Sequence, residues 1–483
     1  MLGPESNEQS AATQTIVIVG GGFSGTMVAV HLLRESSHRL QLHLFEKQPE
    51  RLARGVAYST TYNCHLLNVP ATGMSAYPDR PEHFVSWVNA ISPEQGTTSQ
   101  NSPQRQRFLP RRMYGDYLKS VLAETVSECG SQHDIRFHDE EVVDVRIKGS
   151  AVQVIGSRGT VVTSDQTVLA LGNFPPGDPL RDHQTLRKSP RYARNPWEAD
   201  VLPRLLASKS CLLIGSGLSM LDIALVLKTN GYVGTVHVVS RRGLLPAVHQ
   251  PAGSVPDITE VLNASGMRQT VAAVRRCVAD NDGDWRAVID AMRPTSSHRW
   301  KSLSAREKRQ FLRHVRPYWE IHRHRTASQI RDVFDGMIAS GQVLMRKGRI
   351  DAAEDLGTGV LVSLQDNGRR SRIFVDCVVN CTGPECNFRN IGTPLVDSLL
   401  HQGLATTDVI GFGLAATSDG ALIDSTGAQS SQLFTIGPPM KGQLWETTAV
   451  PELRAQARQL ARRLLGESEA PNAEGSQISA SRS

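Results

Sequence analysis

"IVIVGGGFSG", residues 16–25, decides the fold of the first half of this chain. Its β-branched run is typical of a strand buried in a parallel sheet. Gly20, Gly22 and Gly25 then follow at the spacing GxGxxG. In such a turn the first glycine allows a sharp bend, the second lets the backbone approach a pyrophosphate, and the third lets the helix pack closely on the strand. The stretch therefore predicts a dinucleotide-binding unit, with Phe23 and Ser24 at the helix N-terminus.

A second strand completes this unit. Residues 40–45, LQLHLF, predict a strand that ends at Glu46 and Lys47. An acid placed at the end of the second strand, roughly 20 residues after the glycine turn, is suited to hold ribose hydroxyls. We therefore expect Glu46 to bind the ribose, with Lys47 beside it at the cofactor.

"CLLIGSGLSMLDIALVL", residues 211–227, repeats the pattern in the second half of the chain. Gly215 and Gly217 occupy the first two glycine positions, and Leu218 and Ser219 stand at the helix N-terminus. Met220 replaces the third glycine, so we expect a slightly wider gap between helix and strand. The chain thus predicts two dinucleotide sites.

The strand that follows the second turn ends differently from its counterpart. Residues 235–239 lead to Ser240, Arg241 and Arg242, where the first unit has Glu46. An arginine at this position accommodates a 2′-phosphate, whereas an acid favours a free 2′-hydroxyl. The second site is therefore expected to bind NADPH in preference to NADH. Two solvated arginines remain the alternative interpretation.

The two halves also resemble each other beyond their turns. Residues 141–176 and 348–384 each contain three short alternating strands, a buried run, a glycine (Gly172 or Gly383) and proline. These features predict an α/β fold with two Rossmann-like dinucleotide-binding domains, each with a β-meander insertion. Residues 14–178 and 368–465 would form a discontinuous first domain. Residues 179–367 would form the second domain, with a helical elaboration at about 246–335.

Composition narrows the class of protein. The 483 residues carry a diffuse net charge of +6 and no nucleic-acid reading motif, so no nucleic-acid partner is expected. No apolar run is long enough to predict a membrane span, and the first residues do not resemble a secretory signal. The seven cysteines form no CxxC pair and fit reduced thiols. We therefore expect a cytoplasmic enzyme, with flexible ends at 1–13 and 466–483.

Three stretches resemble a known group of proteins. They are GVAYSTTYNCHLLNVPATGMSAYPDRPEHFVSWV (55–88), RHVRPYWEIHRHR (313–325) and GPPMKGQLWETTAVPELRAQA (437–457). With the two turns, they resemble the two-dinucleotide flavoproteins, and more narrowly a bacterial group of FAD/NAD(P)-binding proteins related to flavin-dependent monooxygenases and amino-acid N-hydroxylases. The resemblance implies FAD in the first domain and NAD(P)H in the second.

The resemblance also implies which residues surround the flavin. It places His65, Asn68, Met74 and Ser75 along the flavin ring, with Asn68, His65 and Ser75 as the catalytic candidates. His65 can equally be a structural residue beside two leucines, and Met74 is expected to pack. Near the C-terminus a strand at 433–436 is expected to lead through Gly437 to a helix that starts near Glu446. That helix would aim its N-terminus at the flavin, with Trp445 and Thr447 as ring neighbours.

The implied reaction begins with hydride transfer from NADPH to FAD. Reduced flavin would then react with O2 to form a peroxyflavin that oxygenates a small polar substrate, with nitrogen as one candidate atom. One alternative is an oxidoreductase that passes electrons to an acceptor without oxygen insertion. Another is a flavin redox sensor whose second turn, altered at Met220, has become vestigial. Oligomeric state and substrate identity stay open.

Other residues give weaker indications. Cys381 and Cys386 have the CxxxxC spacing of a redox pair, but they flank a turn after a buried strand, so a dithiol role is not favoured. His314, His322 and His324 lack accompanying Cys or Asp at ligand spacing, and no metal site is expected. The arginine-rich segment that contains them suits either a lid over an anion or a solvated amphipathic helix.

Overall fold

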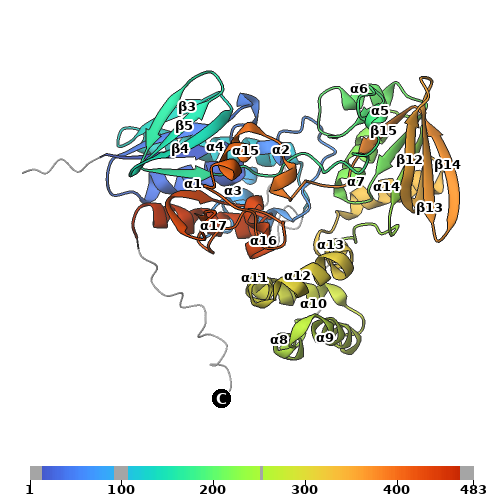
Figure 1. Ribbon diagram of the computed structural model, residues 1–483. Helices are drawn as coiled ribbons and strands as arrows, with labels where there is room; N and C mark the ends of the chain where they lie inside the picture. The colour runs from blue at the N-terminus through green and yellow to red at the C-terminus, as the bar shows by residue number, and fades with distance from the viewer. Residues whose placement is uncertain (1–12, 92–106, 251–253, 468–483) are drawn as a thin grey trace, which may run out of the picture.

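The computed structural model describes residues 13–91, 107–250 and 254–467. It contains two sheet-based units and a separate helical lobe that lies between and below them in the view of Figure 1. The N-terminal segment and the tail that the sequence predicts to be flexible lie outside the described residues, apart from residues 13, 466 and 467. Within the described part of the chain no helix is both long and apolar enough to cross a membrane.

The first sheet is a parallel sheet with one antiparallel edge strand. Its order is β16 (Ala421–Ile423), β17 (Gln429–Thr435), β7 (Gln166–Leu169), β1 (Gln14–Val19), β2 (Leu40–Phe45) and β3 (Asp134–His138). Only β16 runs antiparallel, against β17. The central strand β1 is buried because apolar β-branched side chains project from both of its faces.

The second sheet repeats this topology. Its order is β11 (Val343–Lys347), β10 (Thr235–Ser240), β9 (Ser210–Ile214), β15 (Cys377–Asn380) and β8 (Tyr192–Ala193), with all strands parallel. The run β15-β9-β10-β11 matches β7-β1-β2-β3 of the first sheet. The predicted pair of Rossmann-like units is therefore confirmed.

Both predicted meanders are present as three-stranded antiparallel sheets. The first consists of β4 (Val142–Lys148), β5 (Ala151–Gly156) and β6 (Val161–Ser164), and the second of β12 (Arg349–Asp355), β13 (Val360–Asp366) and β14 (Arg369–Val375). Alternate residues of β5 and β13, such as Val152, Val154, Val360 and Val362, are fully buried. Each meander therefore covers one face of its unit with a half-buried sheet.

The expected boundary between residues 367 and 368 is wrong. Strand β14 pairs with β13 in the second meander, and β15 pairs with β9 in the second sheet, so both strands belong to the second unit. The chain returns to the first unit only after Asn380. The two connections between the units therefore lie side by side. Pro176 and Pro384 form an antiparallel bridge, and Glu385 N donates to Pro175 O at 3.1 Å.

Helices cover the faces of both sheets. Those of the first unit are α1 (Phe23–Glu35), α2 (Gly55–Tyr58), α3 (His83–Ile91), α4 (Arg111–Cys129), α15 (Pro394–His401), α16 (Lys441–Leu444) and α17 (Val450–Leu464). Those of the second unit are α5 (Gln184–Arg187), α6 (Val201–Leu206), α7 (Leu218–Thr229) and α14 (Ser328–Ala339). Helix α14 packs on α7 and β11, so it belongs to this unit although the sequence placed it in the helical elaboration.

The helical elaboration is the lobe below the two units in Figure 1. It contains α8 (Thr259–Asn263), α9 (Gly266–Asp280), α10 (Trp285–Met292), α11 (Ser296–Ser302), α12 (Ala305–Gln310) and α13 (Arg316–Arg323), with a π-helical turn at Phe311–Val315 between the last two. Its own core joins Val261, Val288 and Ile289, separately from the cores of the sheets.

Glycine at position 25 is required by packing, which a pair of helix substitutions tests. A Cβ at Gly25 would lie 1.9 Å from Gly20 O, whereas a Cβ at Gly336, in α14, would meet no atom within 4 Å. Gly25→Ala should lower the free energy of unfolding by about 1–3 kcal/mol or more. Gly336→Ala should raise it by about 0.5–1 kcal/mol, because alanine orders with less entropy loss than glycine. Thermal unfolding followed by circular dichroism checks both; equal midpoints for the two variants would contradict the packing argument.

Candidate functional site

The two glycine turns have the same backbone shape. Gly20 and Gly215 both have φ of +107°, a region that L side chains rarely adopt. A Cβ would lie 2.3 Å from Ala170 O at Gly20, and 2.6 Å from Cys381 O at Gly215. Only glycine therefore fits at either turn, and each turn is pressed against the end of a neighbouring strand, as GxGxxG units require.

Each turn opens onto a helix N-terminus with free N–H groups. Gly22 and Gly217 are the N-cap residues of α1 and α7, and neither helix has an acid in its first turn. The main-chain N–H groups of Phe23, Ser24, Leu218 and Ser219 are among those at these turns that make no hydrogen bond within the described residues. Unpaired N–H groups and the positive end of the helix dipole make both turns suitable for a phosphate anion.

Met220 replaces the third glycine in the second turn, and the fold buries its side chain. Its side chain is fully buried in the core of the second unit, among residues of α7 and the sheet. The second turn therefore keeps its shape despite the substitution. The expected wider gap between helix and strand stays a prediction.

Glu46 lies at the first turn. Its Oε2 accepts a hydrogen bond from Gly21 N at 3.0 Å and its Oε1 accepts one from Gln48 N at 3.1 Å. Each carboxylate oxygen keeps a second lone pair, so the group can still accept bonds from ribose hydroxyls. Lys47 instead pairs with Glu141 at 3.1 Å, and more than half of its side chain is exposed. Its ammonium group therefore lies on the surface.

Ser240 takes the position of Glu46 in the second unit. Its Oγ accepts hydrogen bonds from Gly243 N at 3.0 Å and from Ser216 Oγ at 2.9 Å. These bonds tie the end of β10 to the glycine turn and fix the loop that carries Arg241 and Arg242.

Arginines gather at this end of β10. The pKa of Arg241 is lowered, first by desolvation and then by the positive charges of Arg242, Arg316 and Arg349. Arg242 also donates to Arg313 O at 3.2 Å, which joins the loop to the helical lobe. The sequence predicted the first two arginines, and the fold adds Arg316 from α13 and Arg349 from β12. Such a concentration of like charge favours a bound anion.

Three further glycines lie at the ends of the strands next to the turns. Gly172 and Gly383 both have positive φ, and a Cβ at either would meet no atom within 4 Å. A Cβ at Gly437 would lie 3.0 Å from Ser24 Oγ, so the end of β17 stands beside the first turn. The start of the C-terminal loop therefore lies beside the first glycine turn, while its contact with a dinucleotide stays a prediction.

The residues expected to lie along the flavin ring differ in how free their side chains are to bind a ligand. The Asn68 carboxamide is partly exposed and has no hydrogen-bond partner among the described residues, so it is free to bind a ligand. Met74 is buried in the first core, as expected of a packing residue. Ser75 is completely buried, and its hydroxyl bonds to main-chain groups of Tyr77 and Arg80. We therefore correct the assignment of Ser75 from catalysis to support of the loop.

His65 is also held inside the protein. Its Nε2 donates to Asp222 O at 3.2 Å, so its Nδ1 accepts from the Thr60 hydroxyl at 2.7 Å. Burial lowers the pKa of His65, which keeps the ring neutral. Because both ring nitrogens are engaged, His65 has no group left for substrate, and its expected catalytic role is replaced by a contact between the two units.

Trp445 occupies a strained turn against the helical lobe. Its φ of 63° and ψ of −62°, with a hydrogen bond of 2.8 Å from Glu446 N to Leu444 O, define a γ-turn. Its buried ring packs against Trp300, Phe311 and Phe412. Trp300 Nε1 also donates to Gly442 O at 2.8 Å. The ring therefore faces the lobe, which argues against the expected flavin contact through its face.

The residues after Trp445 are buried polar groups. Glu446 pairs with Arg323 of α13 at 3.0 Å, and both side chains are more than nine-tenths buried. Thr447 is fully buried and donates to Gly437 O at 3.1 Å. The closing helix α17 starts at Val450 and not near Glu446, because the γ-turn and the extended Ala449 delay it. The C-terminal loop is therefore clamped by the lobe.

The remaining sequence candidates do not assemble a reactive centre. Burial raises the pKa of the Cys381 and Cys386 thiols, which opposes thiolate formation, and both are free. The pKa of His324 is lowered to about 3 by burial and then by Arg323, Lys441 and other cations. Among the described residues no group of three His, Cys, Asp or Glu side chains could hold a metal ion.

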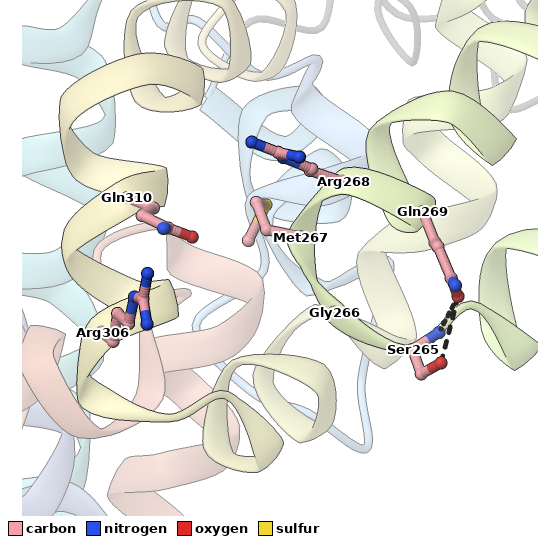
Figure 2. Close-up of a pocket in the computed structure, with 7 residues that line it drawn as sticks. All are labelled: Ser265, Gly266, Met267, Arg268, Gln269, Arg306 and Gln310. Atoms are coloured by element: carbon pink, nitrogen blue, oxygen red, sulfur yellow. Dashed lines mark hydrogen bonds between the residues drawn. The ribbon is translucent and has the colours of Figure 1, made fainter.

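A surface hollow of about 550 Å³ lies in the lobe, between the N-terminus of α9 and helix α12. Figure 2 shows Gln310 and Met267 pointing toward each other across it, while Gln269 is bonded to Ser265. None of its lining residues comes from either glycine turn. The hollow is therefore separate from the candidate dinucleotide sites.

The fold and the paired turns define an α/β protein with two Rossmann-like units. Residues 17–174 match the model of a family described as FAD-NAD(P)-binding, which is the first unit up to its first crossing. A search of curated proteins finds no match.

Solved structures show the same fold over nearly the whole chain. An ornithine hydroxylase from Pseudomonas aeruginosa is 17% identical, with 94% of this chain and 99% of that chain covered and a TM-score of 0.61. An L-lysine 6-monooxygenase from Pseudomonas syringae is 17% identical, with 95% and 100% covered and a TM-score of 0.62. A bacillithiol disulfide reductase from Bacillus cereus is 14% identical, with 94% and 100% covered and a TM-score of 0.51.

Several residues at the site escaped the sequence analysis. Arg111 and Asp222 form a bidentate ion pair between the units, and His249 Nε2 donates to Asn68 O at 2.9 Å. Each pair is separated by more than a hundred positions and carries no local pattern. Only Asp222, a charged residue inside an apolar helical run, gave a signal that could have marked it.

A histidine pair next to Glu46 is expected to make stability depend on pH. His43 and His138 share a hydrogen bond of 2.8 Å, and His138 stacks on Phe45. Burial, and then the charges of His138 and Arg136, lower the pKa of His43 to about 4. Between pH 6.5 and 4 the unfolded chain therefore binds a proton that the folded chain excludes, so stability should fall as pH falls through this range.

Thermal unfolding at a series of pH values measures this effect. His43→Phe, which keeps the ring stack, should flatten the dependence between pH 6.5 and 4, while substitution of the exposed His401 should leave it unchanged. An unaltered slope in His43→Phe would contradict the assignment.

Proposed function

We propose that this chain is an FAD-dependent oxidoreductase that uses NADPH and acts as a monooxygenase on a small polar substrate. The observation that carries the proposal is the pair of anion-binding turns, one ending in an acid and the other in an arginine cluster. Two such turns in one chain fit one dinucleotide that stays bound and one that exchanges. The likeness in fold to flavin-dependent N-hydroxylases over the full length supports the same function.

The first unit fits FAD. The free N–H groups of Phe23 and Ser24 would hold the pyrophosphate, and Glu46 would bind the ribose. Gly437, beside Ser24, brings the C-terminal loop to the same place, with Thr447 fixing its shape. Asn68 supplies a free carboxamide on the segment that we propose to lie along the ring.

The second unit fits NADPH. Leu218 and Ser219 offer free N–H groups for the pyrophosphate, and the arginine cluster would bind the 2′-phosphate. The free-energy gain of one charge-assisted hydrogen bond to that phosphate is about 1.5–3 kcal/mol. A vestigial second turn is disfavoured, because its backbone geometry matches that of the first turn.

The chemistry divides between cofactor and protein. Bound FAD supplies hydride acceptance and the reaction with O2, while the protein orients the reactants and excludes water. The lobe contacts the C-terminal loop through Trp300 and Arg323, and this packing shields the loop from solvent. The raised pKa values of Cys381 and Cys386 make a dithiol acceptor less suited than O2.

The substrate class is proposed from the neighbours of known structure. Their names give ornithine, lysine and cadaverine as substrates, all of which carry a primary amine. We infer that this chain oxygenates a small amine at nitrogen. The seven free cysteines fit a reducing compartment, so we place the enzyme in the cytoplasm.

Arg241→Ala tests the nicotinamide assignment. Loss of one charged contact to the 2′-phosphate should raise the Michaelis constant for NADPH by about ten- to a hundredfold and leave that for NADH unchanged. Arg370→Ala, on the exposed strand β14, is the matched control and should change neither. Equal effects of Arg241→Ala on both nicotinamides would show that the phosphate lies elsewhere.

The reaction itself is tested with purified protein. We expect a yellow protein that retains FAD, is bleached by NADPH without oxygen, and forms a hydroxylated amine in air, detected by mass spectrometry. Ornithine, lysine and cadaverine are the first substrates to assay. Failure to retain added FAD would refute the proposal, whereas bleaching followed by hydrogen peroxide alone with all amines would refute only N-oxygenation.

A further inference from the structure

Asp222 is a buried acid on the helix that presents the second dinucleotide site. It lies in α7, one turn after the free N–H groups of Leu218 and Ser219, and its side chain is only 4% exposed. Its carboxylate accepts two hydrogen bonds from Arg111, from Nη1 at 2.7 Å and from Nη2 at 3.1 Å. A bidentate pair of this kind fixes both distance and orientation between its partners.

Arg111 connects this acid to the other unit. It is the first residue of α4, and its main-chain N donates to His65 O at 2.8 Å while its Nε donates to Leu66 O at 3.0 Å. The same guanidinium therefore holds Asp222 and the segment that leads to Asn68. One planar group thus links the nicotinamide helix to the proposed flavin-side segment.

Two further contacts reinforce the link. His65 Nε2 donates to the main-chain O of Asp222, so α7 contacts this segment directly as well as through Arg111. On the other side of the segment His249, from the second unit, donates to Asn68 O and packs on Phe108. The second unit therefore holds residues 65–68 from both ends.

We propose that Asp222 and Arg111 are a positioning pair that sets the approach of the nicotinamide to the flavin. This inference rests on the proposed function. Three of the five N–H groups of Arg111 bond to Asp222 and Leu66, and the Asp222 carboxylate is buried, so the pair would act through α7 and residues 65–68. Hydride transfer is sensitive to such placement, because a displacement of about 1 Å can slow a reaction about 100-fold.

Rapid mixing with NADPH in the absence of oxygen measures the effect. In Asp222→Asn the limiting rate of flavin reduction should fall at least about tenfold. The NADPH concentration for half-maximal rate should change less than about threefold, because the phosphate contacts remain. The flavin should stay bound with its absorption spectrum intact.

The double variant Asp222→Asn with Arg111→Gln separates positioning from stability. Loss of one partner leaves a buried unpaired charge, which is strongly destabilising, whereas loss of both removes that penalty. The double variant should therefore regain thermal stability but keep the slow reduction. Arg111→Lys, which retains charge without the planar fork, should also reduce slowly.

Glu35→Gln is the matched control. Glu35 pairs with Arg458 at 2.9 Å and Arg462 at 2.8 Å inside the first unit, and its variant should lose stability without losing reduction rate. A normal limiting rate in Asp222→Asn, or a double variant that recovers both rate and stability, would overturn the inference. Wild-type protein that no nicotinamide reduces would overturn the proposed function, and the inference with it.

Discussion

The fold depends on two places where backbone meets backbone too closely for any side chain. At Gly20 and Gly215 the chain turns with positive φ beneath the carbonyl that ends a neighbouring strand. Because each turn is held against its sheet, the following helix must start at the end of the first strand with its N–H groups unpaired. The proposed anion sites would therefore be a consequence of the turn geometry, and the arginines and acids around them would select which anion is bound.

The helical lobe ties the two halves of the molecule together at the C-terminal loop. Its arginines enter from α13 to meet Glu446 and the end of β10, and its aromatic side chains enclose Trp445. A γ-turn at a non-glycine residue is strained by roughly 1–3 kcal/mol and persists only when its surroundings enforce it. The lobe supplies that enforcement, so a segment inserted in one unit controls the backbone of the other.

Local pattern was sufficient to predict the repeated units, their meanders and the cofactor turns, because strand–glycine–helix signals lie within about 30 residues. It failed where distant segments meet. Ser75 and His65 were placed near the flavin by resemblance, yet their polar atoms are taken by the main chain and by Asp222. The boundary at 368 was misplaced because it cut the meander before its last strand and assigned that strand and the following buried run to the first domain. Trp445 was expected to contact the flavin ring, but its packing shows that it faces the lobe.

The bridge between Pro176 and Pro384 brings the entry and exit of the second unit to one point. An excised fragment spanning these crossings would have adjacent ends, and the outer sheet would need only a short loop to rejoin its own strands. The second unit is thus an insertion with adjacent ends, and the first sheet is continuous in connectivity apart from this one insertion.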